Sequence, residues 1–179
     1  MVEQGTVDAL VGLYQDEAPS LVFPEEPIGK TQNCFFVKDG ATWKYTKIDD
    51  LSEIVIGTVS GYSYGELDAF FESKPENKIS LTGSEIGMME RLVGLVRLGR
   101  VDAIVQDRLI TEFFLNNAEA SEKLENAGCL TQVPFYIGFT PNSPFSKEYA
   151  LIFDETLNKM RRSGELDEIL SKYSVMDWE

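Results

Sequence analysis

Hydrophobic and polar positions follow a helical period in some stretches of the chain and a strand pattern in others. In "MMERLVGLVRLG" (residues 88–99), apolar residues recur at helical spacing at Met89, Leu92, Val93 and Val96. Gly99 then stands where a left-handed residue ends a helix. The next residues, "VDAIV", are short, apolar and β-branched, which predicts a strand buried on both faces.

This pattern occurs twice in the sequence. "GTVDALVG" at residues 5–12 returns as "GRVDAIVQ" at residues 99–106. Each copy predicts a helix end, a glycine stop and a buried parallel strand. Nothing similar lies between the copies, which excludes a short solenoid repeat and indicates two separate α/β lobes.

Residues 54–118 alternate strand and helix three times, which predicts a parallel, right-handed β-α-β layer. Ser84 is the expected N-cap of its second helix. Outside this block we expect strands at residues 7–11, 33–39 and 135–139, a helical turn at 47–53, and helices at 146–163 and 165–174 on either side of Gly164. The "FF" pairs at 35–36, 70–71 and 113–114 are expected in the core.

The composition of the chain argues against some classes of function. The 179 residues are 43% hydrophobic, as in a globular protein, and carry 30 acidic against 16 basic side chains, a formal charge of −14. Such a charge disfavours binding to nucleic acid or to an anionic membrane. The sequence holds no apolar run of membrane-spanning length and no signal peptide.

Histidine is absent, which removes the commonest general base and the commonest metal ligand. Two cysteines, Cys34 and Cys129, cannot form a metal site by themselves. They are either buried core thiols, which their apolar neighbours favour, or one disulfide. We therefore expect no metal, no cofactor and no catalytic residue.

Ligands of open parallel sheets bind beyond the carboxyl ends of the strands. The candidates are the residues that follow three of the expected strands: Gly61, Tyr62 and Ser63, then Asp107, then Tyr14 and Glu17. The "SGYSYG" turn is either a backbone cradle for an anionic group or an ordinary strand-to-helix turn. Asp107 would either accept from a ligand ammonium or cap the helix at 108–117.

Nearly the whole chain resembles the extracellular solute-binding proteins of family 3, the type II periplasmic receptors of amino-acid ABC importers. The resemblance is carried by the G-x-V-D-A pair, the strand–Gly–x–Ser turn and the closing "MRRSGELDEILSKY". It implies two α/β lobes joined by hinge strands, with the ligand in the cleft between them. Residues 1–44 would form a truncated lobe 1, 45–132 lobe 2, and 133–179 the return to lobe 1.

The sequence differs from this family in two respects, and both change what we expect of the protein. Its members begin with two further βα units, so "MVEQG" resembles the end of a helix, and we expect a longer, exported, periplasmic protein. We also expect a homodimer or a larger species formed through the truncated lobe, or else a partly disordered lobe 1. Members of the family carry a Thr and a ligand-clamping Arg near the positions of Tyr14 and Glu17, whereas Asp107, Gly61 and Ser63 match its lobe 2 site. An amine-bearing solute therefore fits better than an ordinary amino acid.

The resemblance implies the solute-binding component of an ABC importer, with a small-molecule solute and a membrane permease as partners. A ligand-sensing domain of a signalling protein is the alternative. A small lyase or dehydratase on the same fold is a further one. Without histidine, and with no close carboxylate pair in one motif, we expect the protein not to be an enzyme.

Overall fold

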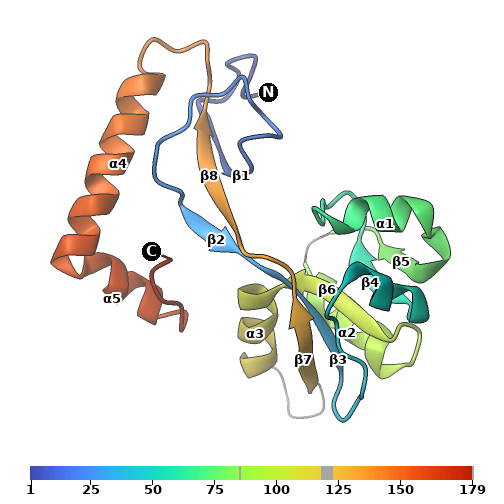
Figure 1. The fold of residues 1–179 in the computed structure, drawn as a ribbon. Coiled ribbons are helices and arrows are strands. Elements are labelled where there is room, and N and C mark those ends of the chain that lie inside the picture. The colour runs from blue at the N-terminus through green and yellow to red at the C-terminus, as the bar shows by residue number, and fades with distance from the viewer. Residues whose placement is uncertain (85, 118–122, 179) are drawn as a thin grey trace. The chain divides into compact units, whose positions relative to one another are not determined.

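The computed structural model describes residues 1–84, 86–117 and 123–178, and the chain divides into two compact units (Figure 1). Unit 1 comprises residues 1–31 together with 132–179, and unit 2 comprises residues 32–131. β3 (Asn33–Lys38), which the sequence boundary places with lobe 1, is hydrogen-bonded within the sheet of unit 2.

Unit 2 contains a five-stranded mixed sheet in the order β5-β4-β6-β3-β7. The other strands are β4 (Ile56–Val59), β5 (Lys78–Leu81), β6 (Ala103–Asp107) and β7 (Leu124–Cys129). β4 pairs in parallel with β5 and β6, as the β-α-β prediction requires. β3 is antiparallel to both β6 and β7.

Alternation along β3 divides the core of unit 2 between the two faces of the sheet. Phe35 and Val37 pack with residues of α1 (Leu67–Ser73), whereas Cys34 and Phe36 pack with residues of α2 (Met88–Arg97). α3 (Arg108–Asn117) adds Phe114 and Leu115 to the second cluster. Two short 3-10 turns, η1 (Ile48–Glu53) and η2 (Pro75–Asn77), complete the unit.

Several local expectations for unit 2 are confirmed and others are wrong. Gly99 has the left-handed conformation (φ 64°) just beyond α2. Ser84 is not the cap of α2, because the helix starts only at Met88 after a left-handed Gly87 (φ 74°). Phe113 is not in the core, since it is about half exposed. The strand β7 was not predicted.

Cys34 and Cys129 form a disulfide, so the expectation of buried free thiols is wrong. The two residues are directly opposite each other in the β3–β7 pairing, with Cα atoms 3.9 Å apart. Apolar neighbours therefore reflect the buried position of the bridge and not an unpaired thiol.

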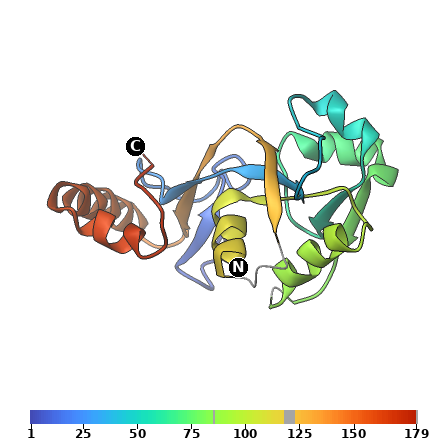
Figure 2. The same ribbon diagram turned by 90° about the horizontal axis from the view of Figure 1, so that it is seen from below.

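Unit 1 contains a three-stranded antiparallel sheet in the order β1-β8-β2. Its elements are β1 (Ala9–Leu13), β2 (Gly29–Thr31), β8 (Val133–Phe139), α4 (Ser146–Ser163) and α5 (Glu165–Ser171). Gly164 (φ 78°) separates the two helices, as predicted, and Figure 2 shows α5 turning away from the axis of α4. Residues 1–5 form a turn, with the amide of Gly5 donating to the carbonyl of Val2.

The first copy of the repeat does not form a buried parallel strand. β1 is antiparallel to β8, lies at the edge of its sheet, and leaves Leu10 and Val11 47% and 65% exposed. The second copy, in β6, is central and buried. The same apolar motif thus differs in burial because its neighbours differ. Within the described residues, no helix is long and apolar enough to cross a membrane.

Candidate functional site

The strand order of unit 2 creates a topological switch point at β4 and β6. α1, which follows β4, packs in one hydrophobic cluster, and α3, which follows β6, packs in the other. The chain therefore leaves these two neighbouring strands toward opposite faces of the sheet. In open α/β sheets, ligands bind at such a point, beyond the carboxyl ends of the strands.

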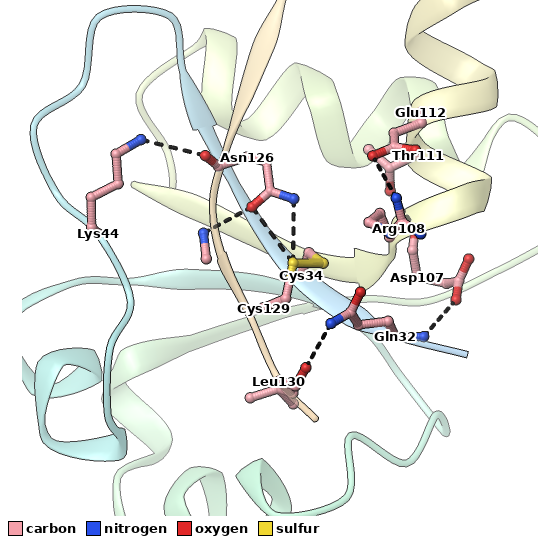
Figure 3. Close-up of a disulfide and its surroundings, with 11 residues drawn as sticks. Gln32, Cys34, Lys44, Asp107, Arg108, Thr111, Glu112, Asn126, Cys129 and Leu130 are labelled. Atoms are coloured by element: carbon pink, nitrogen blue, oxygen red, sulfur yellow. Dashed lines mark hydrogen bonds and ion pairs between the residues drawn. A yellow bond between two sulfur atoms is a disulfide. The ribbon is translucent and has the colours of Figure 1, made fainter. Parts of the chain in front are cut away.

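Asp107 is the last residue of β6 and stands at this edge. Its Oδ1 accepts from the backbone amide of Ile110 at 3.0 Å, which caps α3. Its Oδ2 accepts from the backbone amide of Gln32 at 3.1 Å (Figure 3). The capping interpretation is thus confirmed as a contact. Each carboxylate oxygen has a second lone pair, so capping and ligand binding do not exclude each other.

A hydrogen-bond network joins Asp107 to residues near the first and the last position of unit 2 in the sequence. The side chain of Gln32 donates from Nε2 to the carbonyl of Leu130 at 3.0 Å, and the amide of Leu130 donates to the carbonyl of Asn33 at 2.8 Å. The amide of Arg108 donates to the carbonyl of Gln32 at 2.8 Å. The disulfide of Cys34, two residues after Gln32, lies beside this network (Figure 3). The carboxylate is therefore held by the backbone amides of Gln32 and Ile110, and Gln32 is in turn held by Leu130 and Arg108.

The turn after β4 places Gly61, Tyr62 and Ser63 at the same edge. Gly61 has a positive φ of 84°, which glycine adopts without strain, and Tyr62 is 46% exposed. Ser63 does not present its hydroxyl only to solvent, because Oγ donates to Oδ2 of Asp68 at 2.9 Å. The expected cradle thus already contains a carboxylate of the chain itself.

Tyr64 anchors this turn to the end of β4. Its hydroxyl oxygen accepts from the backbone amide of Val59 at 2.7 Å, and the residue is only 4% exposed. Burial raises the pKa of Tyr64 to about 12, because the charged phenolate would lose its hydration. The turn is therefore positioned by an internal contact and needs no ligand to order it.

The remaining candidates belong to unit 1. Tyr14 follows β1 and is half-buried, and Glu17 is exposed, with its amide donating to the carbonyl of Tyr14 at 3.2 Å. Asp107, Gly61, Tyr62 and Ser63 all lie in unit 2. The structure thus brings the unit 2 candidates to one sheet edge, and the part of Tyr14 and Glu17 in the same site stays a prediction.

Sequence reasoning missed Gln32 and Asp68. Gln32 contributes through a backbone amide, which no side-chain pattern reveals. Asp68 had a signal, since it lies four residues after Tyr64 at the start of a helix, a spacing that suits a carboxylate reaching back to orphan amides. In the part of the chain that the structure describes, no three His, Cys, Asp or Glu side chains are placed to hold a metal ion.

No protein-family model matches the sequence, and no curated protein matches it. Solved structures do. The chain is similar to the probable amino-acid ABC transporter extracellular-binding protein ytmK from Bacillus subtilis (17% identity, TM-score 0.69), and 99% of it aligns to 75% of that protein. It is also similar to a histidine kinase sensor domain with similarity to periplasmic binding proteins (14%, TM-score 0.71; 97% and 72% of the two chains).

A third similar structure is an ancestral amino acid-binding protein described as a precursor of cyclohexadienyl dehydratase (15% identity, TM-score 0.68; 96% of this chain and 70% of that chain). The three neighbours represent transport, sensing and the ancestry of an enzyme, at identities that show the fold alone. Sheet order, alternating elements and these likenesses agree that the chain has the type II periplasmic-binding-protein-like α/β fold.

Proposed function

We propose that this chain is the solute-binding component of an ABC importer and binds a small amine-bearing solute at the carboxyl ends of β4 and β6. The observation that carries the proposal is the Asp107 carboxylate, oriented at the switch point by two backbone amides. An ammonium group is the natural partner of a carboxylate held in this way. The formal charge of −14 favours a cationic solute over an anionic one.

The disulfide supports an exported location. Structural disulfides persist in the periplasm and outside the cell, whereas the cytosol keeps most thiols reduced. Cys34 is fully buried, so its bridge belongs to the core of unit 2. We therefore propose a periplasmic protein that delivers its solute to a membrane permease.

The test is calorimetric titration of the 179-residue chain with amines and amino acids chosen by a thermal-shift screen. Asp107→Asn should weaken binding of the best amine by roughly ten- to a hundredfold, since charge-assisted hydrogen bonds are the strong ones. Asp102→Asn is the matched control. Its Oδ2 accepts from the amide of Val55 at 2.8 Å, just before the start of β6 and away from the proposed site. Equal affinities of the two variants would remove Asp107 from the site.

A ligand-sensing domain is the second candidate, favoured by the likeness to a histidine kinase sensor domain. Both candidates bind a solute, so affinity alone does not separate them. Reconstitution of a permease encoded beside this protein does. A transport component stimulates ATP hydrolysis by the permease when the amine is bound, and a sensor domain leaves that hydrolysis unchanged.

A further inference from the structure

The turn after β4 is occupied by a side chain of the protein itself. The backbone amide of Tyr64 donates to both carboxylate oxygens of Asp68, at 3.0 and 3.1 Å. The hydroxyl of Ser63 donates to Oδ2 of Asp68 at 2.9 Å and accepts from the amide of Gly65 at 3.3 Å. An acidic ligand would need the Tyr64 amide and the Ser63 hydroxyl as donors at this turn. Both therefore already donate to the carboxylate of Asp68.

The turn is held by a contact with the end of β4 and by a contact with α1. The Tyr64 hydroxyl accepts from the amide of Val59, and the Tyr64 ring packs edge-on against Phe71 with ring centroids 6.2 Å apart. Opening the turn to a ligand carboxylate would require displacing Asp68 while Tyr64 stays in the core. A second carboxylate beside Asp68 would also be repelled by its charge.

We propose that Asp68 sets the specificity of the site, so that it takes an amine without a carboxylate in preference to the corresponding amino acid. This inference rests on the proposed function, because Asp107 must still hold the ligand ammonium. Asp68 acts as an internal substitute for the acidic group of an amino acid. The substrate class is thus a small alkyl or aryl amine, a diamine or a guanidino amine.

Three pairs of probes differ by one carboxylate: agmatine and L-arginine, cadaverine and L-lysine, histamine and L-histidine. For each pair that binds, calorimetry on the wild-type chain should give at least about tenfold tighter binding of the amine, the scale of one like-charge contact in a partly hydrated site. Asp68→Ala removes the internal carboxylate and should reduce this ratio about tenfold.

Asp68→Asn keeps an oxygen for the Tyr64 amide but no charge, so the ratio should fall by a smaller factor. It also decides the question if Asp68→Ala does not fold. Glu72→Gln removes one charge from the same helix away from the turn and should leave the ratio as in wild type. The Tyr64 amide signal in ¹H–¹⁵N NMR should respond to the amino acid only in the Asp68→Ala chain.

The outcomes distinguish a failure of the role of Asp68 from a failure of the proposed function. Wild-type binding of an amino acid as tight as that of its amine, or an unchanged ratio in both Asp68 variants, would overturn the role of Asp68 and leave the proposed function standing. Failure of every amine and amino acid to bind the wild-type chain would overturn the proposed function, and this inference with it.

Discussion

The carboxylate of Asp107 accepts a hydrogen bond from the backbone amide of Gln32, a residue 75 positions earlier in the chain, at 3.1 Å. This contact extends the β3–β6 pairing, in which Asn33 stands opposite Asp107. Asp107 therefore does two structural tasks, since its other oxygen caps α3 through Ile110. Any experiment on its role in binding has to account for both contacts.

The first prediction concerns the stability of Asp107→Asn. One amide oxygen can accept from Ile110, but the NH₂ group would then face the donating amide of Gln32. We expect the free energy of unfolding to fall by about 1–2 kcal/mol, the cost of one unsatisfied hydrogen bond. Urea unfolding followed by circular dichroism measures it. An unchanged midpoint would show that the Gln32 contact contributes nothing, and affinity must in any case be measured where both proteins are fully folded.

The second prediction concerns the disulfide. Cys34 and Cys129 are 95 residues apart, and a bridge that closes such a loop stabilises by about 4–5 kcal/mol in the chain-entropy account. Replacing both cysteines by serine should therefore lower the stability of unit 2 by several kcal/mol. Trp43, whose ring packs against Phe35 with centroids 5.6 Å apart, reports on unit 2 when Trp178 is replaced by Phe. A urea midpoint unaffected by reducing agent would contradict this prediction.

Much of unit 2 could be predicted because its signals are local. The block around β4, β5 and β6 carries buried strands, glycine stops and amphipathic helices in an order that permits one parallel layer. Asp107 and the turn at Gly61 were identified for the same reason, since each directly follows a buried strand. Their shared edge follows from parallel pairing alone.

The contacts that the sequence did not reveal depend on register between distant strands. The disulfide needs Cys34 opposite Cys129, and β7, with the sequence "LENAGC", lacks the apolar and β-branched pattern of a strand. Its Gly128 is required all the same, because a Cβ there would lie 2.5 Å from the carbonyl oxygen of Tyr45. The exposure of β1 likewise depends on which elements cover its sheet, and the motif that it shares with β6 does not encode that.

The third prediction is that the 179-residue chain forms a homodimer through unit 1. β1 is an edge strand, with Leu10 and Val11 exposed, and an open edge of this kind pairs readily with another chain. α4 adds exposed Leu151 and Ile152 to the same unit.

Analytical ultracentrifugation should show a dimer that Val11→Lys dissociates. Ile79→Lys, on the exposed edge strand β5 of the other sheet, is the control and should leave the dimer intact. A monomeric wild-type chain at high concentration would rule out this assembly.

The fourth prediction concerns stability at high pH. Burial raises the pKa of Tyr64 to about 12 in the folded chain, against 10.0 for the ordinary side chain, so between these values the folded state retains a proton that the unfolded state loses. By linkage, the stabilisation is fully present below pH 10 and is lost as the pH rises toward 12, by about 2–3 kcal/mol. The protein should therefore unfold at lower urea concentration as the pH increases through this window.

In Tyr64→Phe this part of the pH dependence should vanish, although loss of the Val59 contact lowers stability at every pH by about 1 kcal/mol. Titration of tyrosine absorbance at 295 nm should show one phenol in the wild-type chain that ionises last and is missing from the variant. If wild type and Tyr64→Phe lose stability in parallel above pH 10, the buried phenol is not the group responsible.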